Sequence, residues 1–112
     1  MIEALTLGRG KQITLWEVEN AASTFEYNAE AAIDITGETR AGEAGKWCLE
    51  IKQPYGVVGA ILPWNVPTAM FGFKAASSLA AGNTLVLKSS EKAPLSVRSM
   101  IYLRGIGIDD GV

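Results

Sequence analysis

Two short apolar runs, separated by an apolar segment of helical length, constrain the fold of this chain more than any other feature. The first run is GVVGAIL at positions 56–62, and the second is TLVLK at positions 84–88. Neither run alternates polar and apolar residues, which is typical of strands buried on both faces of a parallel sheet. The strand, helix, strand order over Gly56–Lys88 therefore predicts an α/β fold, in which a right-handed crossover helix joins two parallel strands.

The helix between the two runs has recognisable ends. Pro67 stands where a helix can begin, since proline is favoured in the first turn, and the segment 68–81 is apolar on nearly all sides. Gly82 follows as a helix stop. The next residues supply a turn and place Pro94 near the start of a last helix, which we expect to reach about Arg104.

A further helix is expected before the two strands, over Leu15–Ile33, ending at Thr36-Gly37. Its apolar residues recur at spacings of three and four, which predicts a single buried stripe. The stripe comprises Leu15, Val18, Ala22, Phe25, Ala29, Ala32 and Ile33. The acidic residues expected to lie mostly outside it are Glu17, Glu19, Glu26 and Glu30.

An antiparallel ribbon strand is expected over Trp47–Gln53, because apolar and polar residues alternate there and one face would contact solvent. The residues before it, GETRAGEAGK at positions 37–46, are expected to form a polar connection. A parallel sheet of two long strands is far below the usual number. The helices before, between and after these strands are expected to cover both faces, and the chain is expected to be an incomplete domain, either a piece of a larger α/β domain or one that needs a partner to complete it.

Composition excludes several classes of function. The net charge is −2 with both signs interspersed, so no basic face exists to hold a nucleic acid. The chain has no histidine, which removes Ser–His and Cys–His dyads and most zinc sites, and no metal is expected. The single cysteine, Cys48, suits a reducing compartment such as the cytoplasm. Prolines interrupt the uncharged run Gln53–Phe73, so we expect buried core there and no membrane span.

Candidate site residues follow the two parallel strands. Ligands of open α/β sheets bind beyond the carboxyl ends of the strands, where the loops PWNVP and KSSE place Asn65, Lys88 and Glu91 on one rim. Neither glycine-rich phosphate motif is present. Simpler interpretations stay open from the residues alone. Asn65 is a good helix N-cap, and Lys88 with Glu91 can be a solvated pair worth under ~1 kcal/mol.

These residues resemble a family. QPYGVVGAILPWNVP, then FK, then LAAGNTLVLKSSEKAPLS resemble the aldehyde dehydrogenase superfamily, with a P-W-N turn, a lysine nine residues on, A-G-N-T and K-x-x-E in order. LGRGK, ITGETR and GIGIDDGV agree more weakly. The resemblance covers nearly the whole chain, whereas the chain covers a minor part of the family's length. It implies that residues 1–112 are part of a Rossmann-like cofactor-binding domain.

The resemblance implies oxidation of an aldehyde to a carboxylic acid with NAD or NADP, through a thiohemiacetal on a cysteine. The family's nucleophilic cysteine and general-base glutamate belong beyond Val112, and Cys48 falls on the ribbon strand. The chain alone is therefore expected to be inactive. Two alternatives remain: a non-catalytic product that binds adenine nucleotide or a full-length relative, and a truncated product without a stable fold.

The resemblance also assigns roles by position. The asparagine that matches Asn65 donates its side-chain N–H to the oxyanion, and the residues that match Lys88 and Glu91 hold the adenosine ribose. Met70 and Phe73 match positions near the aldehyde tunnel. The residues implied to line the cofactor cleft are Ile61, Leu62, Pro63 and Trp64. The ribbon resembles the family's oligomerisation strands, which implies a homo-oligomeric parent enzyme acting on a small-molecule aldehyde.

Overall fold

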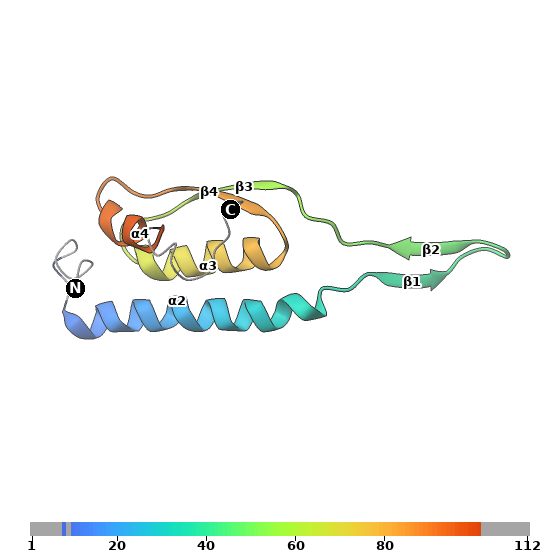
Figure 1. The fold of residues 1–112 in the computed structure, drawn as a ribbon, viewed down its shortest axis with the longest axis horizontal. Coiled ribbons are helices and arrows are strands. Elements are labelled where there is room, and N and C mark those ends of the chain that lie inside the picture. Colours follow the sequence, from blue (N-terminus) through green and yellow to red (C-terminus); the bar gives the residue numbers. More distant parts are fainter. Residues whose placement is uncertain (1–7, 9, 102–112) are drawn as a thin grey trace.

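The body of the protein consists of three layers (Figure 1). A computed structural model describes residues 8 and 10–101. Two parallel strands, β3 (Val57–Ile61) and β4 (Thr84–Lys88), form one layer, and helix α3 (Pro67–Ala80) lies against them. Helix α2 (Lys11–Ala31) packs on the other side of α3.

The predicted strand, helix, strand unit is confirmed. β3 and β4 pair in parallel, with Val57 opposite Thr84 and Ile61 opposite Lys88. Helix α3 begins with Pro67 at its first position. It ends where Gly82 adopts a φ of +77°, a left-handed conformation that glycine adopts without a Cβ penalty. The Gly82 N–H then donates to the Leu79 carbonyl at 2.9 Å.

The predicted first helix exists as α2, followed by the 3-10 turn η1 (Ala32–Asp34), but its predicted buried face is wrong. Glu17 is fully buried, whereas Leu15 is 48% exposed and Ile33 is 83% exposed. The buried residues of α2 are Thr14, Glu17 and Ala21. The small side chain of Ala21 allows helix α3 to approach the α2 backbone closely at Gly72. The large apolar residues Ile13, Leu15, Trp16 and Val18 of α2 are exposed.

The prediction that helices of this chain cover both faces of the sheet is also wrong for the described residues. Helix α3 covers one face, and α2 lies beyond α3, so it does not reach the sheet's other face (Figure 1). Val57, Ile61 and Val86 on that other face are 71%, 77% and 63% exposed. A two-stranded sheet with one bare apolar face is an incomplete α/β domain.

The ribbon contains two strands, one more than expected. β1 (Glu38–Ala41) pairs antiparallel with β2 (Trp47–Glu50), so the prediction of a polar, glycine-bearing connection over 37–46 is wrong in its first part, which forms a strand. Arg40 of β1 forms ion pairs within its own strand and with the neighbouring strand. Its Nη2 lies 2.7 Å from the Glu38 Oε2 of β1 and 4.0 Å from the Glu50 Oε2 of β2. The ribbon extends beyond the layered body along the 65 Å long axis (Figure 1). Both of its faces are exposed, including Trp47 at 81%.

The last helix is described as α4, Pro94–Ile101, and packs near α3. The predicted extension to Arg104 and the segment GIGIDDGV lie outside the described residues. No helix within residues 8 and 10–101 combines the length and apolar character needed to cross a bilayer.

Candidate functional site

Two loops leave the carboxyl ends of β3 and β4 together. The Leu62 N–H donates to the Lys88 carbonyl at 2.9 Å, which extends the parallel pairing one residue beyond β3. The loop after β3 carries Trp64 and Asn65, and the loop after β4 carries Glu91. The structure therefore places the predicted rim residues at the same edge of the sheet.

Asn65 does not cap the helix that follows it. The N-cap position of α3 is Val66, and no side-chain hydrogen bond caps this helix. Pro67 occupies the first helical position, where its missing N–H removes one of the donors that a cap would satisfy. The N-cap interpretation of Asn65 is therefore wrong. Its amide is exposed at the rim and has no cap bond to break before it contacts a ligand.

The residues around Asn65 differ in how they are held. Leu62 is 2% exposed and anchors the start of the loop in the core. Pro63 is half-buried, whereas Ile61 and Trp64 are exposed. A buried anchor with exposed neighbours gives a loop whose backbone is fixed and whose outer surface is open to a ligand.

Lys88 and Glu91 form an exposed ion pair. The Lys88 Nζ lies 3.6 Å from the Glu91 Oε2, and the two side chains are 66% and 79% exposed. A hydrogen bond from its own backbone N–H, followed by the charges of Lys88 and Lys92, holds the pKa of the Glu91 carboxyl below its ordinary value. A pair this exposed contributes little to folding stability, so both groups remain available to a polar ligand.

Lys92 is a rim residue that the sequence interpretation missed. Its Nζ lies 5.6 Å from the centroid of the Trp64 ring, within the range of a cation–π interaction. This contact joins the loop after β4 to the loop after β3. The sequence signal was present, because Lys92 directly follows Glu91, but no local pattern pairs it with an aromatic residue 28 positions earlier.

Met70 and Phe73 lie on helix α3, three residues apart, and so share a face. Met70 is half-buried and Phe73 is 47% exposed. The next residue, Lys74, is also exposed and corresponds to the lysine nine residues after Asn65. Met70, Phe73 and Lys74 therefore form an amphipathic, solvent-accessible strip on α3, the helix that follows the PWN turn.

Asn83 fastens the turn between α3 and β4 to the start of β3. Its Oδ1 accepts the Gly56 N–H at 3.0 Å, and its Nδ2 donates to the Ser78 carbonyl at 3.2 Å. The Thr84 N–H donates back to the Gly56 carbonyl at 2.8 Å. Asn83 is buried and acts on the amino end of the strands, away from the rim.

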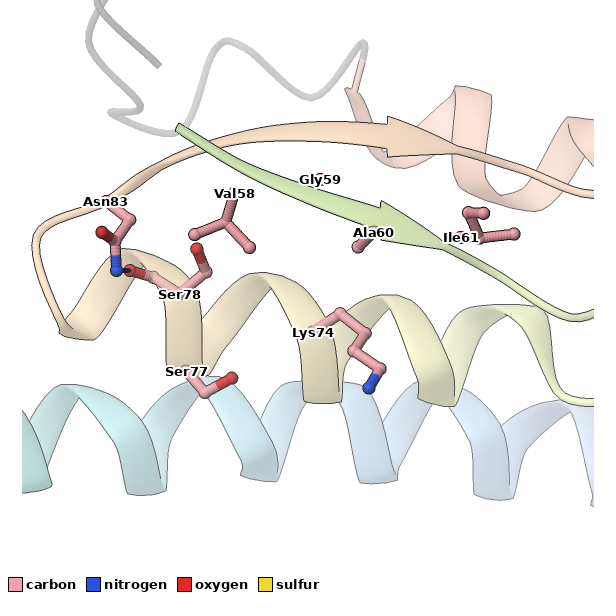
Figure 2. Close-up of a pocket in the computed structure, with 8 residues that line it drawn as sticks. All are labelled: Val58, Gly59, Ala60, Ile61, Lys74, Ser77, Ser78 and Asn83. Carbon is pink, nitrogen blue, oxygen red and sulfur yellow. Dashed lines mark hydrogen bonds between the residues drawn. The ribbon is translucent and has the colours of Figure 1, made fainter. Parts of the chain in front are cut away.

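A hollow of about 360 Å³ lies between α3 and β3 (Figure 2). It is lined by Val58–Ile61 of β3, by Lys74, Ser77 and Ser78 of α3, and by Asn83. In Figure 2, Ser78 points toward Val58, and its Oγ is buried without a hydrogen-bond partner among the described residues. Within that part of the chain β3 pairs with β4 alone. We attribute the hollow to the open edge of the sheet, and we do not assign it a ligand.

Cys48 is not part of the rim. It lies exposed on β2 of the ribbon, which extends away from the layered body (Figure 1). In the described stretch of chain, no group of three or more His, Cys, Asp or Glu side chains could hold a metal ion.

The arrangement defines a class of site. A parallel strand pair with a crossover helix, with an amide, a carboxylate and two ammonium groups at its carboxyl edge, places these groups where open α/β sheets bind their ligands. The comparison with protein families is more specific. The model described as the aldehyde dehydrogenase family matches residues 1–112. The chain belongs to the aldehyde dehydrogenase family, whose members are oxidoreductases that act on aldehydes with NAD(P).

Individual relatives support the family assignment. A probable succinate-semialdehyde dehydrogenase (NADP(+)) of Sinorhizobium fredii is 47% identical over 98 residues, which cover 86% of this chain and 20% of that protein. The crystal structure of an E. coli NADP dependent enzyme matches with a TM-score of 0.88 and 41% identity, over 91% of this chain and 21% of that one. PnpE in complex with nicotinamide adenine dinucleotide matches with a TM-score of 0.81 and 35% identity, over 91% and 21%. The chain thus spans about a fifth of the length of its relatives.

Proposed function

We propose that this chain is the part of an NAD(P)-dependent aldehyde dehydrogenase that supplies the adenosine-side rim and the oxyanion donor. The observation that carries the proposal is that Asn65 is exposed beside the charged loop and does not cap α3. Membership of the aldehyde dehydrogenase family suggests the role of oxyanion donor for this non-capping amide. Relatives named as NADP enzymes and a solved relative in complex with NAD support both cofactors.

The charged rim fits the adenosine side of such a cofactor. The Glu91 carboxyl is ionised at neutral pH, and its neighbours lower its pKa further, so it can accept hydrogen bonds from ribose hydroxyls. The exposed Lys88 ammonium lies 3.6 Å from that carboxylate and has donors left for the same ribose. When bound, the cofactor supplies the acceptor for a hydride. The cleft-lining roles of Ile61, Leu62, Pro63 and Trp64 belong to the same proposal.

Asn65 would act on the substrate. A neutral amide N–H held at a fixed place stabilises the negative charge that develops on an aldehyde oxygen when a thiolate attacks it. The amide adds no proton to the reaction and needs no change of charge. One such donor contributes about 10²–10³-fold in kcat. Met70 and Phe73, open on the strip of α3 that follows Asn65, would line the approach of the aldehyde.

The nucleophile and the general base are proposed to come from parts of the enzyme other than this chain. Cys48 is exposed on β2 of the ribbon, which extends away from the layered body that contains β3 and α3 (Figure 1). We therefore expect no aldehyde oxidation by the 112-residue chain alone. Formation of reduced cofactor that depends on aldehyde and on the purified chain would contradict this part of the proposal.

The exposed apolar surfaces fit the same proposal. Val57, Ile61 and Val86 leave one sheet face bare, and the hollow beside β3 marks an open sheet edge. We propose that further strands and helices of a longer polypeptide cover both. The ribbon, with Trp47 and Leu49 81% and 65% exposed, would pack against a second subunit.

A second candidate function follows from the same rim. Because the ribose-side groups Lys88 and Glu91 are both present and accessible, the chain could bind adenine nucleotide, or a full-length relative, without catalysing a reaction. Titration calorimetry with NAD tests this candidate. No heat at millimolar NAD would remove the nucleotide-binding part of it, whereas heat that is lost in Glu91→Ala would support it.

A chimera tests the leading proposal. Residues 10–101 would replace the matching segment of the Sinorhizobium fredii relative, and aldehyde-dependent formation of reduced cofactor would be measured. We expect activity in the chimera and a raised KM for the cofactor in its Glu91→Ala variant. A soluble, cooperatively folded chimera without activity would contradict the proposal. Glu43→Ala is a matched control, since Glu43 also forms an exposed ion pair, with Lys46 at 3.0 Å, but lies in the ribbon.

A further inference from the structure

Lys92 bridges the two rim loops. Its ammonium lies 5.6 Å from the centroid of the Trp64 ring, and a cation at this distance is attracted to the ring face. Trp64 belongs to the loop after β3, whereas Lys92 belongs to the loop after β4. The two lysines make different contacts: Lys88, the last residue of β4, pairs with Glu91 of the loop after β4, whereas Lys92 contacts Trp64 of the loop after β3.

Both ends of this bridge start from fixed backbone. The Lys92 N–H donates to the Ser90 Oγ at 3.3 Å, and the N–H of the buried Ala93 donates to the Ser90 carbonyl at 3.2 Å. The loop of Trp64 begins at the buried Leu62, which is bonded to the β4 backbone. The backbone at both anchors is held by hydrogen bonds, whereas the Trp64 side chain is exposed. A side-chain contact can therefore still fix the position of the Trp64 ring.

We propose that Lys92 is a positioning residue, which holds the Trp64 ring and thereby fixes the loop that presents Asn65 relative to Lys88 and Glu91. Trp64 directly precedes Asn65, so a rotation of the tryptophan backbone moves the amide donor. Small displacements of a positioned group lower a rate strongly. The catalytic consequence rests on the proposed function, whereas the placement of Trp64 does not.

The placement is tested on the full 112-residue chain with Trp16→Phe and Trp47→Phe, which leaves Trp64 as its only tryptophan. Acrylamide quenching of Trp64 fluorescence is compared in Lys92→Met and Lys92→Arg, and circular dichroism verifies that each variant is folded. Methionine keeps the length of the stem without the charge, and arginine keeps a cation over the ring. We expect the quenching constant to rise about twofold in Lys92→Met and to return in Lys92→Arg. An unchanged constant in Lys92→Met, or an equal rise in Lys92→Arg, would overturn the proposal.

The coupling to the cofactor side is tested by a double-mutant cycle on NAD affinity with Lys92→Met and Trp64→Leu. If Lys92 acts through Trp64, Lys92→Met weakens binding about two- to fivefold in the parent chain and has no further effect in Trp64→Leu. Independent, additive losses would overturn the positioning role. If no variant binds NAD while the quenching pattern holds, nucleotide binding by the isolated chain, the second candidate function, fails and the placement of Trp64 by Lys92 is supported.

Discussion

Gly72 of helix α3 lies directly against Ala21 of helix α2. A Cβ atom built on Gly72 would be 2.7 Å from the Cα and 3.1 Å from the Cβ of Ala21. Real Cβ atoms do not approach backbone this closely, so the two helices must separate to admit any other residue. The contact explains why the buried position 21 of α2 holds a side chain as small as alanine.

Gly72→Ala is therefore expected to destabilise the chain. Alanine favours a helix by about 1 kcal/mol over glycine, but overpacking a tight contact costs about 1–3 kcal/mol. We expect a net loss of about 1 kcal/mol in the free energy of unfolding, measured by thermal denaturation as a Tm lowered by about 4–8 °C. Gly59→Ala is the matched control, since nothing lies within 4 Å of its built Cβ and its Tm should not fall. A Tm for Gly72→Ala equal to or above that of the parent would contradict the close packing.

Asn83→Ala is expected to cost about 1–3 kcal/mol of stability, because it removes two hydrogen bonds of a buried amide. Asn20→Ala serves as the control. It removes an exposed bond from the Asn20 Nδ2 to the Trp16 carbonyl at 2.9 Å within α2, and exposed substitutions usually stay within about 0.5 kcal/mol. Urea denaturation of both variants measures the difference. Equal midpoints would show that Asn83 does not fasten β3 to the α3–β4 turn.

The Glu91 carboxyl is expected to titrate below its ordinary pKa of 4.5. Its backbone hydrogen bond and the Lys88 and Lys92 charges favour the ionised form. The stabilisation from this group is therefore present above pH 4.5 and is lost as the pH falls through the lowered pKa. Carbon-13 NMR titration of the carboxyl measures the midpoint. In Lys88→Met the midpoint should move upward, and a midpoint at or above 4.5 in the parent chain would contradict the arrangement.

Asn65→Ala is expected to leave the stability of the chain unchanged within about 0.5 kcal/mol. A capping asparagine would lose about 1 kcal/mol on this substitution, but α3 has no side-chain cap. Thermal denaturation distinguishes an Asn65 that caps α3 from one that does not. A Tm lowered by about 4–8 °C would restore the capping interpretation.

The sequence predicted the strand, helix, strand unit well because its signals are local. Unbroken apolar runs, Pro67 and Gly82 mark the elements without reference to the rest of the chain. The buried face of α2 could not be predicted in the same way. Periodicity assigns burial to the most apolar stripe, but the close approach of Ala21 to Gly72 selected a face that contains the charged Glu17.

The candidate site was predicted where topology alone determines it. Asn65 follows β3, Lys88 ends β4 and Glu91 follows β4, and residues at the carboxyl ends of parallel strands must meet at one sheet edge. The contacts that fasten the site were not predictable, because they join side chains far apart in sequence. Lys92 meets Trp64 across 28 positions, and Asn83 meets Gly56 across 27. No local sequence pattern predicts either contact.

The role of Asn65 is the central claim, and the kcat of the Asn65→Ala chimera at saturating aldehyde and cofactor tests it most directly. An oxyanion donor predicts a kcat about 10²–10³-fold below that of the parent chimera. A kcat that is unchanged in a folded Asn65→Ala chimera would contradict the account.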